Sequence, residues 1–387
     1  MTDGLRLACM LGDGIGPEIV PVARRIADEA LTRSGADPVD WVDLPMGAAA
    51  LAEFGYALPP ANIEVLDGCD GWLAGPHDSE SYPESWHAGP EGVPGVILRG
   101  HYELYANIRP SKSHPTVPSL VKDVDLVIVR ENTEGFYPDR NMFSGNGEFM
   151  PTPDVALCVG KFSRTAARRI ARSAFELAEL RRRHVTIVHK SNVIPVCFGL
   201  FLEECRAVAR EHPDVQVDDF LFDAMAAHLV RRPQAFDVIV TENLFGDTLS
   251  DLASELTGSL GMAASINAGA KYAMAQAAHG SAPDIAGQGI ANPLGMVMSV
   301  AMLLQWLGER NADPAVAAAA ASIEAAVDTV INTGALTPDM GGSATTATIT
   351  DALIHGLPAR RAAQASGVHS GGSGGDHGGH AGPGFAD

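Results

Sequence analysis

The alternation of short apolar runs with longer amphipathic stretches is the feature that most constrains the fold of this chain. The apolar runs are typical of β-strands and read LRLACML, GWLAGP, DLVIVRE, VTIVHK and FDVIVTEN. Helical patterns accompany them, for example over residues 163–183 and 314–332. This alternation predicts an α/β fold with an open, mostly parallel sheet. At 387 residues the chain exceeds the usual size of a single core, so we expect two domains.

Polar residues directly follow several of the apolar runs. In open parallel sheets, ligands bind beyond the carboxyl ends of the strands, which makes polar residues at those ends site candidates. By this rule the candidates are Arg130, Glu131, His189, Lys190, Glu242 and Asn243.

The glycine-rich turn GDGIGPE, residues 12–18, resembles part of a dinucleotide-binding fingerprint. The full fingerprint requires a further glycine two residues on and an acidic residue about 20 positions later. Here Pro17 and Glu18 follow instead, and a carboxylate in the first helical turn would repel a pyrophosphate. The motif is therefore a weak match to a Rossmann fingerprint, and a tight turn between a strand and a helix is the favoured interpretation.

Composition excludes several classes of protein. The 27 basic and 47 acidic residues give a net charge of −20, which argues against a nucleic-acid partner. No long apolar run and no secretory signal are visible, so we expect a cytoplasmic protein without a membrane partner. The five cysteines lack the spacing of a disulfide framework or a zinc site. Residues 366–387 form a Gly/His-rich tail that we expect to be disordered.

The stretch ENLFGDTLSDLASEL places two aspartates four residues apart. On a helix, Asp247 and Asp251 share one face, while Phe245 and Leu249 fall on the opposite face. Paired carboxylates of this kind suit magnesium or manganese, and an exposed acidic face is the alternative interpretation.

Three further stretches carry candidate ligand contacts. Arg99, Arg109 and Arg130 could clamp two carboxylates, although surface arginines are common. Lys190 follows an apolar run, where partial burial could lower its pKa enough for a role as a base, and a simple lysine at a strand end is the equally weighted alternative. The loop HGSAPDIAGQGIANP, residues 279–293, would let a planar ligand approach the backbone, or it is an ordinary Gly/Pro surface loop.

Eight ordered motifs together resemble the β-decarboxylating dehydrogenases, the family of isocitrate, 3-isopropylmalate, homoisocitrate and tartrate/D-malate dehydrogenases. The motifs span roughly residues 5–355, and the 3-isopropylmalate enzymes are the subgroup favoured. They are GDGIGPE, LYANIRP, VRENTEGFY, HKSN, DAMAAHLV, TENLFGDTLSDLASEL, HGSAPDIAGQGIANP and TPDMGGSATT.

The resemblance implies a two-domain fold that is not a standard Rossmann fold. Its cofactor domain would be discontinuous, with residues 1–104 and 258–365. Residues 105–257 would carry the substrate, the metal and the dimer contact. The family's members are homodimers in which Lys190 and Asp223 reach the site across the interface.

Site residues carried over from the family fall into four sets. The catalytic residues are Tyr137 and Lys190. The substrate carboxylates would be bound by Arg99, Arg109, Arg130 and Asn192. The divalent metal, magnesium or manganese, would be held by Asp223, Asp247 and Asp251, with a monovalent cation such as potassium as a further candidate. The cofactor would be bound by His279, Gly280, Ser281, Ala282, Asp284, Ile285, Asn292 and Asp339.

The cofactor loop and the substrate segment refine what the resemblance implies. Asp284 and Ile285 stand where NADP-dependent relatives carry Lys and Tyr, so the chain resembles the NAD-dependent members. The reaction implied is oxidative decarboxylation of a 3-substituted malate, a small dicarboxylate, to a 2-oxo acid. A catalytically silent regulatory subunit is the alternative of another class, and the presence of Tyr137, Lys190 and all three aspartates argues against it.

Substrate choice in this family lies in the helix before the first arginine, here GPEGVPGVILRG. Isopropylmalate enzymes usually carry Glu at the position of Gly92 and Leu at those of Gly95 and Val96, whereas isocitrate enzymes carry Ser and Asn at those of Val93 and Gly95. Neither signature is present. We expect Pro94 to disturb the helix and the two glycines to leave room, which favours a 3-alkylmalate. Tartrate, D-malate, isocitrate and homoisocitrate stay open as alternatives.

Overall fold

The computed structural model describes residues 4–83, 92–137, 141–145 and 147–359, so the tail at 366–387 and the last residues of the expected cofactor domain lie outside it. A ten-stranded sheet has the order β2-β1-β3-β12-β11-β4-β5-β10-β8-β9. Its strands are β1 (Arg6–Met10), β2 (Asp40–Asp43), β3 (Gly71–Ala74), β4 (Ala106–Lys112), β5 (Asp125–Glu131), β8 (His184–His189), β9 (Gln216–Leu221), β10 (Val238–Thr241), β11 (Ile266–Ala268) and β12 (Ala273–Ala275).

The mostly parallel α/β fold expected from the sequence is confirmed. Within the ten-stranded sheet of the described residues, the pairs β11–β12, β11–β4 and β4–β5 are antiparallel, and the other neighbouring pairs are parallel. The helices are α1 (Gly16–Ser34), α2 (Ala48–Phe54), α3 (Ala61–Leu66), α4 (Pro94–His101), α5 (Arg164–Glu179), α6 (Pro195–Ala209), α7 (Phe222–Arg231), α8 (Asn243–Thr257), α9 (Leu294–Arg310), α10 (Pro314–Asn332) and α11 (Thr346–Gly356).

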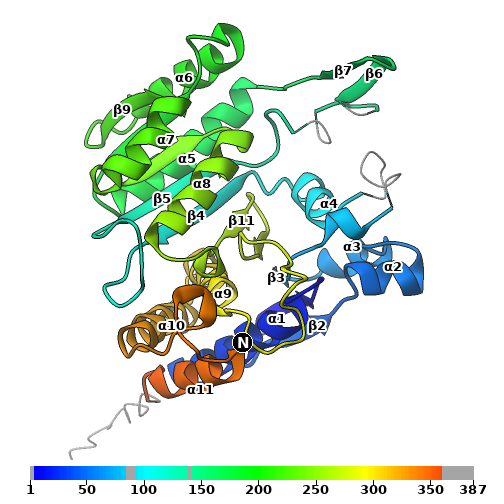
Figure 1. The fold of residues 1–387 in the computed structure, drawn as a ribbon, viewed down its shortest axis with the longest axis vertical. Helices are drawn as coiled ribbons and strands as arrows, with labels where there is room; N and C mark the ends of the chain where they lie inside the picture. The colour runs from blue at the N-terminus through cyan, green and yellow to red at the C-terminus, as the bar shows by residue number, and fades with distance from the viewer. Residues whose placement is uncertain (1–3, 84–91, 138–140, 146, 360–387) are drawn as a thin grey trace, which may run out of the picture.

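The molecule has two lobes that share the sheet (Figure 1). The central lobe contains β4, β5, β8, β9, β10 and helices α5 to α8, drawn in cyan and green. The terminal lobe contains β1 to β3, β11, β12 and helices α1 to α4 and α9 to α11. A separate two-stranded arm, β6 (Glu148–Thr152) with β7 (Val155–Cys158), projects from the central lobe.

Helices cover both faces of the sheet in each lobe. In the central lobe one hydrophobic cluster contains Phe175 and the cluster on the other side contains Leu249. In the terminal lobe, Val300 belongs to the larger cluster and Trp72 to the smaller one. Because both faces are covered, strands such as β5 are buried along nearly their whole length, which explains their continuous apolar sequence.

Local signals in the sequence fix several helix starts. Glu242 accepts hydrogen bonds from the backbone N–H groups of Leu244 and Phe245 and so caps α8. Asp313 caps α10 in the same way. The expectation that Pro94 disturbs its helix is wrong, because Pro94 stands at the first position of α4, where a missing N–H has no cost.

Helix α10 is long and apolar enough to cross a membrane by length and composition alone. It packs against α9, α1 and α11, and Val316, Ile323 and Val330 on it are buried in the terminal-lobe core. Its apolar character therefore follows from its place between helices of the core.

Candidate active site between the lobes

Arg109 and Arg130 lie on neighbouring strands and face helix α8. Asn107 on β4 is the register partner of Arg130 on β5, and alternate residues of a strand share a face. Arg130 donates from Nε and Nη2 to Asn243 Oδ1, at 2.9 and 2.7 Å. Arg109 donates to Asn107 Oδ1 at 2.6 Å and to Ser250 Oγ at 2.7 Å. Both buried guanidinium groups are thus held in fixed orientations.

Asp247 is the shared acceptor of this cluster. Arg130 Nη1 donates to Asp247 Oδ1, Arg109 Nη1 lies 3.0 Å from the same oxygen, and the Tyr137 hydroxyl donates to Oδ2 at 2.6 Å. Burial would raise the pKa of Asp247, but the two arginines outweigh it and lower that pKa. Burial and the hydrogen bond to Asp247 raise the pKa of Tyr137, so its phenol stays protonated at neutral pH.

Asp251 lies one helical turn beyond Asp247 and extends the acidic face that the sequence predicts. Its Oδ1 lies 3.3 Å from Arg109 Nη1, and its side chain is 51% exposed. Phe245 and Leu249 on the opposite face are buried. The periodicity thus predicted correctly that Asp247 and Asp251 share the face of α8 opposite Phe245 and Leu249.

Lys190 and Asp223 form a separate pair. Lys190 follows β8, Asp223 opens α7, and Lys190 Nζ donates to Asp223 Oδ1, which lowers the pKa of that exposed carboxyl. Within the described part of the chain, no three His, Cys, Asp or Glu side chains gather as a metal site. One chain therefore brings together Asp247 and Asp251 but not Asp223.

The donor set nevertheless fits a hard divalent cation. Asp247 and Asp251 offer carboxylate oxygens on adjacent turns, and oxygen ligands suit magnesium or manganese.

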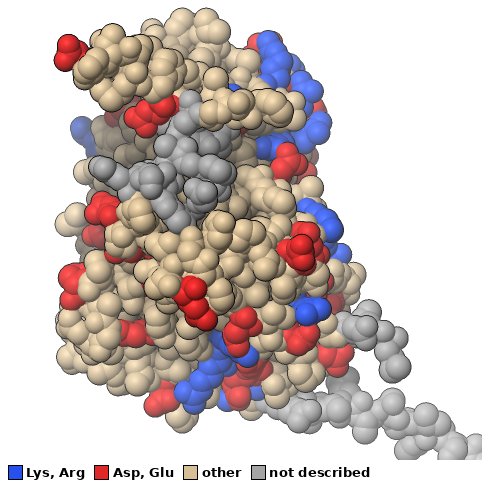
Figure 2. Space-filling model, turned by 90° about the vertical axis from the view of Figure 1, so that its right-hand side faces the viewer, with Lys and Arg blue, Asp and Glu red and all other residues tan. Residues whose placement is uncertain are grey.

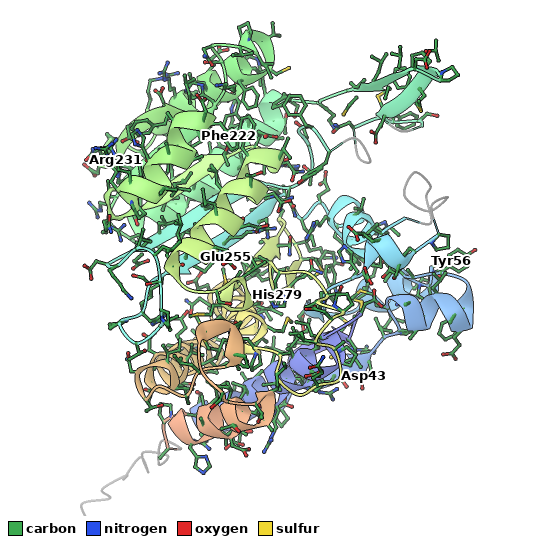
Figure 3. The ribbon with its side chains drawn as sticks, viewed as in Figure 1. Asp43, Tyr56, Phe222, Arg231, Glu255 and His279 are labelled. Carbon is green, nitrogen blue, oxygen red and sulfur yellow. The ribbon has the colours of Figure 1, made fainter. Side chains whose placement is uncertain are left out.

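A cavity of about 490 Å³ lies beside the loop over residues 279–293. Of the predicted cofactor residues, those that line it are His279, Gly280, Ala282, Ile285, Asn292 and Asp339. Its walls combine apolar side chains with a few polar groups, as nucleotide-binding pockets do. Figure 3 shows His279 and Glu255, which both line the cavity, at the junction of the two lobes.

His279 supplies an unused polar atom in this cavity. Its Nε2 is buried and has no hydrogen-bond partner among the described residues, and burial lowers its pKa so that the ring is neutral. Asp339 is held by Asn292 Nδ2 at 2.9 Å and also accepts from Ser259 and Thr337. The cavity therefore fits a planar, partly polar ligand such as a nucleotide.

The turn GDGIGPE packs against this loop rather than presenting its glycines to open space. A Cβ at Gly14, whose φ is +55°, would lie 2.0 Å from the carbonyl oxygen of Ser281. The Ile15 N–H donates to that oxygen at 2.8 Å, and Glu18 accepts from the Gly287 N–H. Glu18 thus closes the loop, which gives the carboxylate a structural role in place of phosphate binding.

Other predicted residues lie outside these clusters. Arg99 on α4 donates to Gln276 Oε1 at 2.9 Å. Asn192 and Asp284 are exposed, and neither lines the 490 Å³ cavity. Sequence reasoning missed Asn107, Ser250 and Gln276, which orient the arginines, because their roles depend on the strand order and on the contact with α8.

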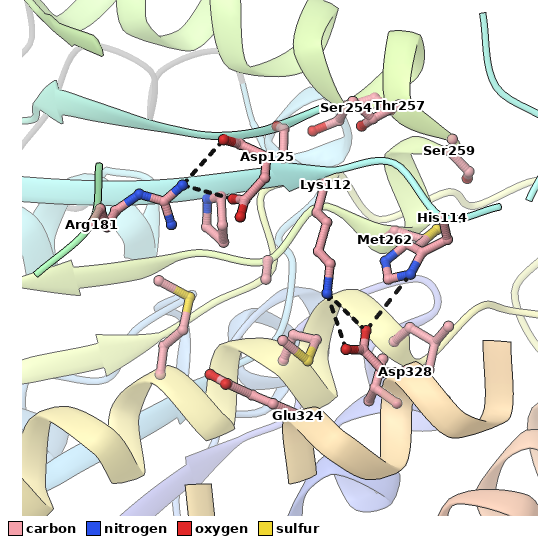
Figure 4. A pocket seen from close by; sticks show the side chains of 18 residues that line it. Lys112, His114, Asp125, Arg181, Ser254, Thr257, Ser259, Met262, Glu324 and Asp328 are labelled. Atoms are coloured by element: carbon pink, nitrogen blue, oxygen red, sulfur yellow. Dashed lines mark hydrogen bonds and ion pairs between the residues drawn. The ribbon is translucent and has the colours of Figure 1, made fainter. Parts of the chain in front are cut away.

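A second cavity, of about 270 Å³, lies near the start of β5, at the opposite end of that strand from Arg130 (Figure 4). Lys112 at the end of β4 donates to Asp328 on α10 at 3.0 Å, and His114 lies 3.7 Å from the same carboxylate. None of the predicted site residues lines this cavity. Its ion pairs join the two lobes away from the candidate active site.

The arginine cluster contributes little to the outer surface. Figure 2 shows acidic side chains scattered over the face in view and basic ones gathered mainly along one edge. Arg109 and Arg130 are only 5% and 3% exposed. The chain therefore combines an acidic exterior with a buried cationic cluster, which is what a small anionic ligand requires.

Glu242, which caps α8, gives the fold a predicted pH dependence. Burial raises its pKa from 4.5 to about 7. Because the folded state binds this proton more tightly than the unfolded state, protonated Glu242 adds to the free energy of unfolding. This contribution is complete below about pH 4.5 and is lost as the pH rises through about 7. Glu242→Gln keeps an acceptor for the cap, so it should gain stability relative to the native protein between pH 5 and pH 8 in urea unfolding. Glu53→Gln, at an exposed position, is the control, and parallel profiles for E242Q and the native protein would contradict the assignment.

Known proteins resemble this chain over most of its length. The family model described as isocitrate/isopropylmalate dehydrogenase matches residues 6–353. The isocitrate/homoisocitrate dehydrogenase of Thermus thermophilus is 42% identical over 91% of this chain and 98% of its own length. The 3-isopropylmalate dehydrogenase of Sulfurisphaera tokodaii is 41% identical over 89% and 96%. The crystal structure of isocitrate dehydrogenase from Methylococcus capsulatus superposes with a TM-score of 0.80 at 38% identity, covering 91% of this chain and 99% of that one.

Proposed function

Because the chain belongs to the isocitrate/isopropylmalate dehydrogenase family, we propose that it catalyses the NAD-dependent and divalent-metal-dependent oxidative decarboxylation of a 3-substituted (R)-malate to a 2-oxo acid and carbon dioxide. The observation that carries this proposal is the cluster in which Arg109, Arg130 and Tyr137 surround Asp247. In this cluster, two arginines can bind carboxylates, an aspartate can bind a metal ion, and the Tyr137 phenol stays protonated.

Each of these residues has its own role in the proposed reaction. Arg109 and Arg130, with Arg99, bind the malate carboxylates. Lys190 accepts the proton of the C2 hydroxyl, and a bound NAD would supply the acceptor for the hydride of C2. Tyr137, whose raised pKa keeps it protonated, donates a proton to C3 after the β-carboxylate has left. A divalent metal at Asp247, Asp251 and Asp223 would supply Lewis-acid stabilisation of the charge that develops on the C2 oxygen.

A homodimer with shared sites completes this arrangement. Lys190 and Asp223 lie apart from the Asp247 cluster within one chain, as described above. Val193 and Val196, just after Lys190, are 64% and 81% exposed, and the β6–β7 arm exposes Phe149 and Met150. Exposed apolar side chains of this kind mark association surfaces. We infer that a second copy covers them and brings its Lys190 and Asp223 to the site.

The choice of NAD over NADP is proposed from Asp284. A carboxylate there favours the ribose hydroxyls of NAD and repels the 2′-phosphate of NADP. Asp284→Asn is expected to improve the NADP/NAD ratio of kcat/KM by about tenfold, the effect of losing about 1.4 kcal/mol of repulsion. Asp351→Asn, on the exposed face of α11, is the control. An unchanged ratio in the Asp284 variant would remove Asp284 from cofactor choice.

The residues of α4 and of the segment before it bear on the substituent at C3 of the substrate. The apolar side chains of Val93 and Val96 favour a 3-alkylmalate such as 3-isopropylmalate. The expectation that Gly95 leaves room for a bulky group is wrong, since a Cβ there would lie 2.8 Å from the ring of His77. A substituent that carries oxygen, as in isocitrate, homoisocitrate or tartrate, stays open as the second candidate.

The direct test is NADH formation with purified protein, manganese and potassium across 3-isopropylmalate, isocitrate, homoisocitrate, tartrate and D-malate. We expect turnover of at least one of these with NAD, and its loss when a chelator removes the metal. Turnover that survives complete chelation would contradict the metal-dependent reaction.

A further inference from the structure

The cavity of about 270 Å³ between the lobes has no part in the proposed reaction. Ligand pockets usually span about 300–1,000 Å³, so a cavity of this size suits a small molecule. Its central-lobe wall contains Ser111 on β4 and Ser254 on α8, and its terminal-lobe wall comes from α9 and α10. A molecule that fills the cavity would therefore contact both lobes.

Ser111 supplies an unused hydrogen-bonding group in the lining of this cavity. Its side chain is 4% exposed, and its Oγ is buried without a hydrogen-bond partner among the described residues. Alternate residues of a strand share a face, so Ser111 lies on the face of β4 from which Arg109 contacts α8. Ser254, which also lines the cavity, comes one helical turn after the Ser250 that Arg109 contacts. A buried hydroxyl in this state favours a ligand that restores its hydrogen bond.

Glu324 on α10 is a second unused group in the lining. It is exposed to solvent as well as lining the cavity, so it stands where the cavity opens. It forms no hydrogen bond or ion pair with the other described residues, and Figure 4 draws none for it. Burial and then the nearby Asp328 raise the pKa of Glu324, as expected for a carboxylate without a cation in contact.

The other charged groups of the lining are already paired. Lys112 Nζ donates to both oxygens of Asp328, at 3.0 and 3.2 Å, and Arg181 Nη2 donates to Asp125 Oδ1 at 2.7 Å. Burial lowers the pKa of His114, so its ring is neutral at physiological pH. The carboxylate at the mouth is thus the charge in this lining that lacks a counter-ion, which favours a cationic ligand.

Apolar side chains make up much of the remaining lining. They include Met262, Met298, Met302, Leu294 and Val327. Methionine side chains are unbranched and adapt to the shape of what they contact. The lining therefore suits a ligand that carries an aliphatic chain in addition to its charge.

The cavity shares a wall with the 490 Å³ cavity beside residues 279–293. Ser259 lines both cavities. Its Oγ donates to Asp339 and accepts from the Gly261 N–H at 3.0 Å, and both of these residues line the larger cavity. Leu294, which lines the smaller cavity, donates from its N–H to Asn292 Oδ1 at 3.0 Å. A ligand in the smaller cavity would thus contact residues that hold the wall of the larger one.

We propose that the smaller cavity is a binding site for a small aliphatic amine and that its occupancy changes the affinity for NAD. The ammonium group pairs with Glu324, the chain packs against the methionines, and a polar group at the far end hydrogen-bonds to Ser111. The amine site is independent of the proposed function, whereas the effect on NAD rests on it. Two sites that share a wall influence each other reciprocally, because each ligand then changes the binding free energy of the other.

The test titrates the native protein by calorimetry with 6-amino-1-hexanol, with 1,6-hexanediol, which lacks the ammonium group, and with hexylamine, which lacks the hydroxyl. We expect 6-amino-1-hexanol to bind with a Kd of about 1 mM or lower. Each of the other two probes should bind at least about fivefold more weakly, because each leaves one polar group of the cavity without a partner.

Two variants separate the two polar ends of the ligand. Glu324→Gln should weaken the binding of 6-amino-1-hexanol about tenfold and leave that of 1,6-hexanediol unchanged. Ser111→Ala should weaken 6-amino-1-hexanol about fivefold and leave hexylamine unchanged. Glu309→Gln, at an exposed position of α9 outside the lining, is the control. Saturation with 6-amino-1-hexanol should change the Kd for NAD at least about threefold in the native protein.

Two results would overturn the amine site. They are a native protein that binds none of the three probes with a Kd below about 10 mM, and a binding of 6-amino-1-hexanol that both variants leave unchanged. Amine binding that does not alter the Kd for NAD would overturn the effect of one cavity on the other. A protein that binds the amine but not NAD would contradict the proposed function and support the amine site. Circular dichroism checks the folding of each variant, and the three probes test the native protein without any substitution.

Discussion

Replacing Asp247 by asparagine is expected to lower kcat at least about a thousandfold, because a metal site contributes several kcal/mol to transition-state stabilisation and each 1.4 kcal/mol is a factor of ten. The asparagine would keep the volume of the side chain but lose the charge shared by Arg109, Arg130 and Tyr137. The affinity for Mn²⁺, measured by titration without substrate, should fall in parallel.

Removing the carboxylate also leaves two buried arginines without their shared counter-charge. We expect a loss of about 1–3 kcal/mol in the free energy of unfolding at neutral pH. NAD binding should survive, since the cavity beside residues 279–293 does not include Asp247. Asp351→Asn on α11 serves as the matched control. An Asp247→Asn variant with native Mn²⁺ affinity would remove this residue from the metal site.

Lys190→Met is expected to reduce kcat by about 10²–10⁴-fold, the usual contribution of a positioned general base. Methionine preserves most of the apolar stem, so the loss reports on the amine that contacts Asp223. Binding of NAD should be unchanged, because Lys190 does not line the cofactor cavity. Full activity in this variant would refute the assigned role.

The same variant tests whether two chains share each site. If Lys190 of one copy serves Asp247 of the other, co-expressing Lys190→Met with Asp247→Asn gives mixed dimers with one intact site each. Random assembly of the two chains should then restore about one quarter of native activity. Mixed dimers, purified through a different affinity tag on each chain, that remain inactive would show that each chain uses its own lysine.

The sequence predicted the parts of the site that depend on local periodicity. The spacing of Asp247 and Asp251 against Phe245 and Leu249 identified the exposed face of α8, and the rule about strand ends singled out Arg130 and Asn243, which prove to be hydrogen-bonded. These features follow from the periodicity of a single helix and from the direction of a single strand.

Features that depend on strand order could not be predicted in this way. β12 lies between β3 and β11, which allows Gln276 to contact both Gly75 and Arg99, and no local pattern encodes that neighbour relation. The same limit explains the wrong expectation for Gly95. A glycine indicates space only when nothing from elsewhere fills it, and here His77, from a different element, occupies that space.

The stoichiometry of the two products tests most directly whether this enzyme couples oxidation to decarboxylation. With the best substrate of the malate series, NAD and Mn²⁺, we would measure NADH and carbon dioxide released from the same reaction. We expect equal amounts of the two products, and no formation of either after chelation. NADH formed without carbon dioxide would contradict it, because the enzyme would then be a simple 2-hydroxy acid dehydrogenase.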